Sequence, residues 1–250
     1  MDYILETHGL VKDFKGFTAV DRVDLKVRRG SIHALIGPNG AGKTTVFNLL
    51  TKFLAPTRGR IVYNGEDITK AGPAVVAKRG LVRSFQISSV FPHMTALENV
   101  RLGLQAAKPR DSFAFWRSGR ALNELNDQAL ELLGAVGLAE LADVVAVELP
   151  YGRKRALEFA TTLALDPELM LLDEPTQGMG TEDVGAITQL LKRVAQGRTV
   201  LMVEHNLNVV ADLADRITVL QRGAVLAEGD YAEVSTNPEV RSAYMGGAHA

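Results

Sequence analysis

The chain has 250 residues, and its 28 Lys and Arg side chains against 29 Asp and Glu give a formal net charge of −1. This balance argues against a general nucleic-acid coat, which would need a basic face. The absence of cysteine excludes disulfides, thiolate zinc sites and cysteine nucleophiles. The N-terminus lacks the basic segment and apolar core of a signal peptide, and no run approaches the roughly 20 apolar residues of a membrane span. We therefore expect a cytoplasmic protein that reaches a membrane only through a partner.

The first part of the chain predicts strands joined by turns. Val23, Leu25 and Val27 alternate with charged residues, the pattern of a half-buried antiparallel strand. After a turn at Arg29-Gly30, residues 32–36 form a short apolar run that predicts another strand. We therefore expect this part of the chain to consist mainly of β-structure.

The next stretch, GPNGAGKTT at residues 37–45, contains the phosphate-binding pattern G-x-x-x-x-G-K-[ST] and is called the phosphate loop below. Its glycines permit backbone angles at which successive N–H groups point at an anion, and the helix predicted after it adds unpaired N–H groups. Lys43 is expected to reach the outer phosphates, and the Thr44 hydroxyl to ligate magnesium. We predict a nucleotide site made of Gly37, Pro38, Asn39, Gly40, Ala41, Gly42, Lys43, Thr44 and Thr45.

After the first helix, the chain predicts a hairpin and then a short helix. Residues 60–63 predict a strand closed by Asn64-Gly65, a strong hairpin signal. A helix at 74–78 leads to an apolar stretch that ends at Gln86. Gln86 is a candidate polar contact to magnesium or to a water molecule.

Residues 87–146 change in character to a leucine-rich helical pattern. We predict that they form a helical subdomain inserted into an α/β core made of residues 1–86 and 147–250. The insert carries three aromatic residues beside several arginines, namely Phe113, Phe115 and Trp116. This cluster predicts either a packed helix–helix junction or an exposed anchor for another protein.

Two strands in the second half of the chain end in charged or titratable residues. Residues 169–173 form an apolar run typical of a strand buried on both faces in a parallel sheet, and it closes with Asp173 and Glu174. Asp173 is a candidate magnesium ligand, and Glu174 is a candidate base that orients and deprotonates the attacking water. A second predicted strand, at 199–205, ends at His205. This histidine is either a contact to the γ-phosphate or a structural residue.

In this order, these elements resemble the ATP-binding subunits of ABC transporters over nearly the whole chain. The phosphate loop resembles the Walker A loop, Gln86 the glutamine of the Q-loop, and residues 169–173 the Walker B strand. Glu174 resembles the catalytic glutamate and His205 the switch histidine. The resemblance implies an α/β phosphate-loop NTPase core, with a mixed sheet and helices on both faces, an antiparallel β subdomain and a helical insert.

The resemblance also implies where ATP and Mg²⁺ bind. Phe14 resembles the aromatic residue that stacks on adenine, with Phe17 as the second choice and Val20 beside it. The expected magnesium ligands are Thr44, Gln86 and Asp173. The signature segment, which would face the ATP of a second subunit, corresponds to Leu149, Pro150, Tyr151, Gly152 and Arg153.

Within that family, several stretches resemble the ATPase subunits of branched-chain amino acid importers. They are IGPNGAGKTTVFNLLT, VRSFQISSVFPHMTALENV, LPYGRKRALEFA, VEHNLNVV and AYMGG. They imply ATP hydrolysis coupled to import of branched-chain or related amino acids through a separate membrane permease. The implied partners are the permease subunits, a second ABC ATPase subunit and, indirectly, a solute-binding protein, with no nucleic acid. The implied location is the inner face of the cell membrane.

Two positions depart from the family pattern. The signature usually reads Leu-Ser-Gly-Gly-Gln, and here Pro150 replaces the serine, which removes a hydroxyl and an N–H donor. Gly180 stands where the family usually has Asp or Asn, and the resemblance implies that this loop contacts the other subunit. Because a homodimer would carry both changes in both sites, they favour a heterodimer with a partner that keeps the serine. The alternative is a homodimer in which Gly152 and the following helix N-terminus suffice.

The predicted loop within residues 86–99 carries four apolar residues, Val90, Phe91, Pro92 and Met94. It begins at the implied Q-loop, where the core meets the helical insert. We expect this segment to face the permease. The alternative is a loop that packs on itself.

Two other functions stay open at this point. One is an ABC protein that acts on ribosomes or DNA; such proteins usually carry two ATPase modules or long coiled-coil insertions, and this chain has neither. The near-zero net charge also counts against it. The other is a regulatory ATP-binding module without hydrolysis. Glu174 and His205 count against this second function, whereas the altered signature and Gly180 favour it.

Overall fold

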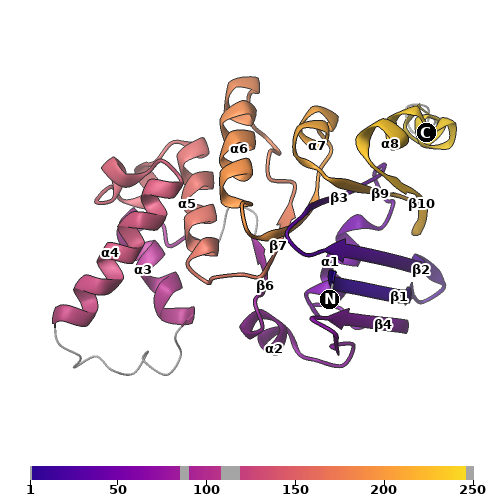
Figure 1. Cartoon of the computed structure of the whole chain (residues 1–250), viewed down its shortest axis with the longest axis horizontal. Coiled ribbons are helices and arrows are strands. Elements are labelled where there is room, and N and C mark those ends of the chain that lie inside the picture. Colours follow the sequence, from indigo (N-terminus) through magenta and orange to yellow (C-terminus); the bar gives the residue numbers. More distant parts are fainter. Residues whose placement is uncertain (1, 85–89, 108–118, 246–250) are drawn as a thin grey trace. The chain divides into compact units, whose positions relative to one another are not determined.

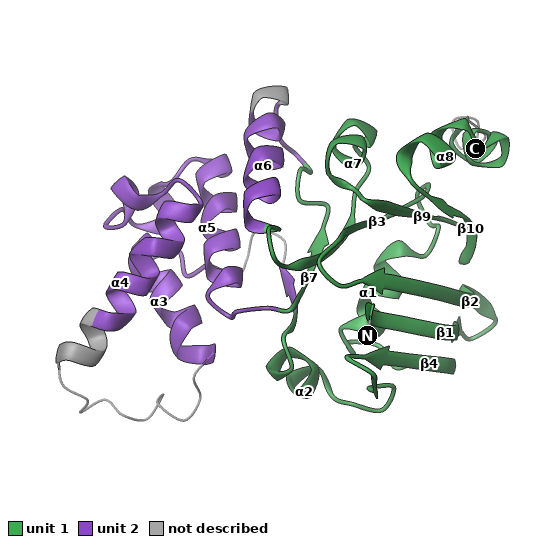
Figure 2. Ribbon diagram, viewed as in Figure 1, with its two compact units in different colours: residues 1–81, 168–177, 195–250 green, residues 82–167, 178–194 purple. Residues whose placement is uncertain are grey.

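The computed structural model describes residues 2–84, 90–107 and 119–245. The helices and strands are labelled along the chain in Figure 1, and the chain divides into two compact units (Figure 2). Unit 1 comprises residues 1–81, 168–177 and 195–250, and unit 2 comprises residues 82–167 and 178–194. The subdomain limits at residues 86 and 147 stay a prediction.

One sheet of unit 1 has four strands in the order β2-β1-β4-β5. These strands are β1 (Tyr3–Phe14), β2 (Phe17–Arg28), β4 (Arg58–Tyr63) and β5 (Glu66–Asp67), and each neighbouring pair is antiparallel. Val23, Leu25 and Val27 of β2 are fully buried and the charged residues between them are exposed, as their alternation predicted. The predicted Asn64-Gly65 turn joins β4 to β5, with positive φ at both residues.

The second sheet has six strands in the order β10-β9-β3-β8-β7-β6. They are β3 (Ile32–Ile36), β6 (Leu81–Ser84), β7 (Leu169–Asp173), β8 (Thr199–Val203), β9 (Arg216–Gln221) and β10 (Ala224–Gly229). Strands β9, β3, β8 and β7 run parallel, and β10 is antiparallel to β9. Every residue of β7 and β8 is buried, which explains their unbroken apolar runs. The strand predicted at 199–205 was too long, because β8 ends at Val203.

The described residues of unit 1 form the helices α1 (Lys43–Leu50), α2 (Pro73–Lys78), α7 (Leu207–Leu213), α8 (Tyr231–Thr236) and α9 (Pro238–Met245). The buried face of α1, with Val46, Leu49 and Leu50, belongs to a hydrophobic core that also contains residues of both sheets. The phosphate loop at the start of α1 is therefore attached to a helix whose inner face lies in this core.

Apart from residues 82–84 of β6, the described elements of unit 2 are helices. Its elements are α3 (Ala96–Ala107), α4 (Gly119–Ala135), two short 3₁₀ helices (Ala139–Leu141 and Ala146–Glu148), α5 (Tyr151–Leu163) and α6 (Thr181–Val194). A Cβ on Gly103 of α3 would lie 2.8 Å from the Ala164 Cβ atom, so only glycine lets α3 approach the end of α5 this closely. The aromatic cluster at 113–116 lies outside the described residues. Within the described ranges, no helix combines the length and apolar character needed to cross a membrane.

Candidate nucleotide site

Three parallel strands of the six-stranded sheet place the predicted site residues at one edge. Leu35 of β3, Val203 of β8 and Asp173 of β7 stand in register across the sheet. Because the carboxyl ends of parallel strands meet at the same edge, the segments that follow these strands lie together. They are the phosphate loop after β3, His205 after β8 and Glu174 after β7, all within unit 1.

The phosphate loop needs its glycines for two physical reasons. Gly37, Gly40 and Gly42 have φ angles of 148°, 77° and 101°, which L side chains rarely adopt. A Cβ on Gly37 would lie 2.2 Å from the carbonyl oxygen of Leu220, and one on Gly42 would lie 2.5 Å from that of Ala19. The loop therefore packs directly on the backbones of β9 and β2.

Lys43 begins α1 and folds its side chain back over the phosphate loop. Its Nζ donates to the carbonyl oxygens of Gly37 at 2.7 Å and Pro38 at 3.0 Å. Burial lowers the pKa of Lys43, while the negative charges of Glu174 and Asp173 act in the opposite direction. The ammonium group thus lies inside the loop and within the electric field of both carboxylates.

Thr44 and Asp173 offer the kind of donor that Mg²⁺ prefers. Thr44 is exposed in the first turn of α1, and Asp173 is buried at the end of β7. A hydroxyl and a carboxylate are hard oxygen ligands, so this donor set fits magnesium. Gln86, the third expected ligand, lies outside the described residues.

Glu174 and His205 form a hydrogen-bonded pair. The distance from His205 Nε2 to Glu174 Oε1 is 2.7 Å, and both side chains are partly accessible to water. Glu174 has a φ of 48°, in a region that non-glycine residues seldom occupy, and its N–H donates to the Val203 carbonyl at 2.9 Å. A carboxylate held in this way can orient a water molecule and accept its proton.

Glu204 organises the loops that carry this pair, and sequence reasoning did not single it out. Its buried carboxylate accepts the N–H and the hydroxyl of Thr176 at one oxygen, at 3.0 and 2.5 Å. The other oxygen accepts the N–H groups of His205 at 2.8 Å and Asn206 at 3.0 Å. Glu204 therefore ties the loop after β7 to the loop after β8. The available signal was an acid directly after an apolar strand, a place where burial requires hydrogen-bond partners.

The residues expected near adenine lie in the hairpin of β1 and β2. Phe14 and Phe17 are paired across this hairpin, and both are exposed. Lys12 Nζ lies 5.1 Å from the centre of the Phe14 ring, in a cation–π contact. Val20 is fully buried in the core, so only the two phenylalanine rings are at the surface. Stacking of adenine on either ring stays a prediction.

The signature segment opens α5 in unit 2. Leu149 is buried, Gly152 is half-buried, and Pro150, Tyr151 and Arg153 are exposed. Pro150 is the N-cap residue and makes no side-chain capping bond, whereas a serine there would supply one. Arg153 is held by a 2.9 Å hydrogen bond to the carbonyl of Gly137. Gly180 precedes α6, and its carbonyl accepts the N–H of Val184 at 3.0 Å.

Comparisons with known proteins agree with this arrangement. Residues 20–177 match the ABC transporter family, and residues 224–250 match the family described as branched-chain amino acid ATP-binding cassette transporter. The chain is 39% identical to the high-affinity branched-chain amino acid transport ATP-binding protein BraF of Pseudomonas aeruginosa, over 98% of each chain. It is 36% identical to the corresponding protein LivG of Escherichia coli K12, again over 98% of each.

Two solved structures show the same fold. The ADP conformation of an ATP-binding cassette of an ABC transporter superposes with a TM-score of 0.85 at 31% identity, covering 98% of this chain and 100% of that one. A dimeric post-hydrolysis cassette bound to ADP and Pi gives a TM-score of 0.75 at 27% identity, covering 91% and 98%. The phosphate-loop ATPase fold expected from the sequence is confirmed. The chain therefore belongs to the ABC transporter family, among its branched-chain amino acid ATP-binding cassettes.

Proposed function

We propose that this ABC ATPase drives import of branched-chain or related amino acids through a separate membrane permease. The single observation that best supports ATP hydrolysis is the hydrogen bond between Glu174 and His205. These two residues follow strands β7 and β8, beside the phosphate loop at the edge of the parallel sheet. The substrate is inferred from the relatives, whose names specify branched-chain amino acid transport and whose length this chain matches.

In the proposed reaction, each site residue has a distinct task. Lys43 leaves the loop carbonyls to bind the outer phosphates of ATP. Mg²⁺, held by Thr44, Asp173 and Gln86, would neutralise charge on the phosphate oxygens. The Glu174 carboxylate accepts the proton of the water that attacks the γ-phosphorus, while the bond to the bridging oxygen of ADP breaks. His205 keeps that carboxylate in place.

We also propose that two cassettes enclose two ATP molecules, each completed by the signature segment of the other subunit. The dimeric cassette bound to ADP and Pi supports this arrangement. The second subunit is either another copy of this chain or a related ATPase. In both cases the pair would dock on the inner face of the membrane through the permease.

Reconstitution tests the transport function. The chain would be assembled in proteoliposomes with a candidate permease for branched-chain amino acids and the matching solute-binding protein. We expect ATP hydrolysis to rise severalfold when leucine-loaded binding protein is added, together with ATP-dependent uptake of labelled leucine. ATP hydrolysis that does not respond to any membrane partner, or uptake of a chemically different solute only, would contradict the proposal.

A substitution at Phe91 tests the expected contact between this chain and the permease. Its backbone is anchored, because its N–H and carbonyl bond the amide group of Asn99 at 2.7 and 3.1 Å, yet its side chain is 55% exposed. An anchored, exposed aromatic residue is suited to bind a pocket on a partner. We expect Phe91→Ala to lower the affinity for the permease about tenfold or more, with unchanged ATP binding by the isolated chain.

The matched control is Phe53→Ala in unit 1, at a side chain that is 56% exposed. It should co-purify with the permease at the wild-type level. Equal recovery of both variants would show instead that the loop at 90–95 is an ordinary surface loop.

A further inference from the structure

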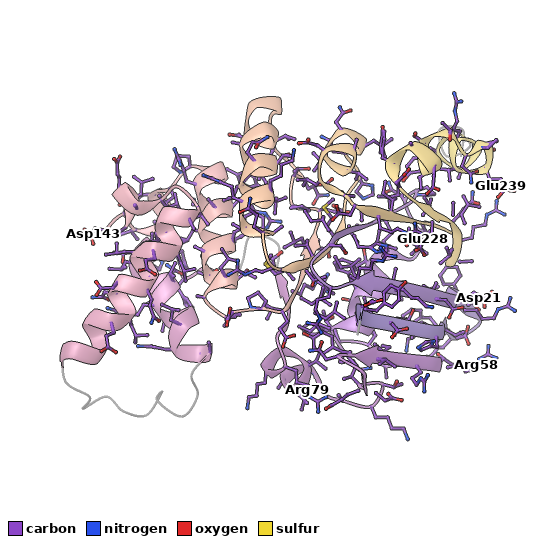
Figure 3. The ribbon with its side chains drawn as sticks, in the orientation of Figure 1. Asp21, Arg58, Arg79, Asp143, Glu228 and Glu239 are labelled. Carbon is purple, nitrogen blue, oxygen red and sulfur yellow. The ribbon has the colours of Figure 1, made fainter. Side chains whose placement is uncertain are left out.

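Glu204 is a buried acid of unit 1 to which the proposed reaction gives no task. Charged side chains are usually exposed, as are those of Arg79 and Glu239, which are labelled in Figure 3. Glu204 is only 2% exposed, and it stands between Val203, the last residue of β8, and His205. A buried carboxylate is costly unless it is hydrogen-bonded, so its partners indicate its role.

The hydrogen bonds described for Glu204 fit a carboxylate and no other group of its size. One oxygen accepts the N–H and the hydroxyl of Thr176, and the other accepts the N–H groups of His205 and Asn206. Three of these donors are backbone N–H groups, which cannot become acceptors. The amide of a glutamine would therefore bring its NH₂ group against at least one of them.

Through its first oxygen, Glu204 holds the turn that carries Glu174. The N–H of Gln177 donates to the Glu174 carbonyl at 3.1 Å, which closes a four-residue turn with Thr176 in the third position. Glu174, with its φ of 48°, is the first residue of this turn. The two bonds from Thr176 to Glu204 thus restrain the backbone that orients the Glu174 side chain.

Through its second oxygen, Glu204 holds the loop that carries His205. This loop is anchored at its far end, because Asn206 caps helix α7 by accepting the N–H groups of Asn208 and Val209 at 3.1 and 3.4 Å. Helix α7 in turn has buried apolar residues. Glu204 therefore connects an anchored loop to the turn that carries the proposed base.

We propose that Glu204 is a positioning residue for the hydrolysis step. It holds the Glu174 turn and the His205 loop at the separation that allows the 2.7 Å hydrogen bond between these two side chains. The four bonds occupy the acceptor sites of its carboxylate, so Glu204 acts through Glu174 and not on the nucleotide. A base displaced by even 1 Å meets the attacking water poorly. This inference deepens the proposed ATPase function and rests on it.

Glu204→Gln keeps the size of the side chain and disrupts the bonds on at least one side. We expect kcat to fall about tenfold to 100-fold, with KM and the Kd for ATP near their wild-type values. Glu168→Gln is the matched control, because this exposed carboxylate precedes β7 and also joins separate segments, accepting from Arg29 and Asn64 at 3.0 and 3.2 Å. It should leave kcat, KM and Kd unchanged.

A double variant distinguishes positioning from a structural role. If Glu204 acts through the Glu174 carboxylate, Glu204→Gln should lower the single-turnover rate no further once Glu174→Gln is present. A further loss of about tenfold in the double variant, or a lower melting temperature of Glu204→Gln with unchanged kcat, would overturn the inference.

Thr176→Val tests the same connection even if Glu204→Gln fails to fold. It removes the hydroxyl that donates to Glu204 and keeps the Thr176 N–H. We expect kcat to fall about threefold to tenfold, as the loss of one such hydrogen bond would produce. Thr176→Ser keeps the hydroxyl and should have a kcat near the wild-type value. Equal kcat values for Thr176→Val and Thr176→Ser would overturn the proposal.

The same measurements separate this inference from the proposed function. A wild-type chain that binds ATP but does not hydrolyse it, alone or with its membrane partner, would remove the ATPase function and the role of Glu204 with it. Wild-type kcat in both Glu204→Gln and Thr176→Val would remove only the role of Glu204.

Discussion

Glu174→Gln is expected to bind ATP as the wild-type chain does and to hydrolyse it about 100- to 10,000-fold more slowly. The amide has the size of the carboxylate and can still hydrogen-bond His205, which lies 2.7 Å from the native oxygen. It cannot accept a proton from the attacking water. Phosphate release under single-turnover conditions, with a calorimetric ATP titration, measures the two effects separately.

The matched control is Glu131→Gln, at an exposed carboxylate of α4 in unit 2. It should hydrolyse ATP at the wild-type rate. Hydrolysis by Glu174→Gln at more than about a tenth of the wild-type rate would be too fast for loss of a general base. Another group would then have to activate the water.

The same variant distinguishes a homodimer from a heterodimer. Because ATP is not cleaved, the subunits that enclose it should stay joined on size exclusion. Pro150 has neither a hydroxyl nor a backbone N–H, so the signature of this chain offers fewer donors to a nucleotide than the usual serine does. ATP-dependent dimerisation only with a related ATPase subunit would support the heterodimer. A stable homodimer of the purified variant would make that hypothesis unnecessary.

Lys43→Ala should weaken ATP binding about 100-fold or more, because a charged hydrogen-bond donor to the phosphates is lost. The fold should survive. Lys43 donates only to the carbonyls of Gly37 and Pro38 among its described hydrogen bonds, so the expected cost is about 1 kcal/mol, or roughly 2–4 °C in melting temperature. Calorimetric titration and thermal unfolding measure the two quantities.

Lys78→Ala is the control for the loss of one positive charge, since Lys78 is exposed at the end of α2. It should leave both ATP affinity and melting temperature unchanged. Wild-type ATP affinity in Lys43→Ala would contradict the assignment of the phosphate loop itself, because no other loop residue carries a positive charge.

The amino-acid sequence alone determined the features that depend on local backbone chemistry. The phosphate loop was predictable because glycine readily adopts the φ angles of Gly37, Gly40 and Gly42, which L side chains rarely adopt. The position of Asp173 was predictable because an unbroken apolar run marks a buried parallel strand, and a polar residue after it must stand at the edge of the sheet.

Only the tertiary structure decided which distant groups meet at that edge. Glu204 bonds Thr176 across 28 positions of sequence, and the N–H of Gly223 donates to the carbonyl of Ala41 in the phosphate loop from the other end of the chain. Neither contact leaves a trace in local periodicity, since the partner of a buried polar group is set by strand order and helix packing. The predicted end of the strand at His205 was wrong for the same reason. The Glu204 carboxylate accepts hydrogen bonds from the loops after β7 and β8, and β8 itself ends at Val203.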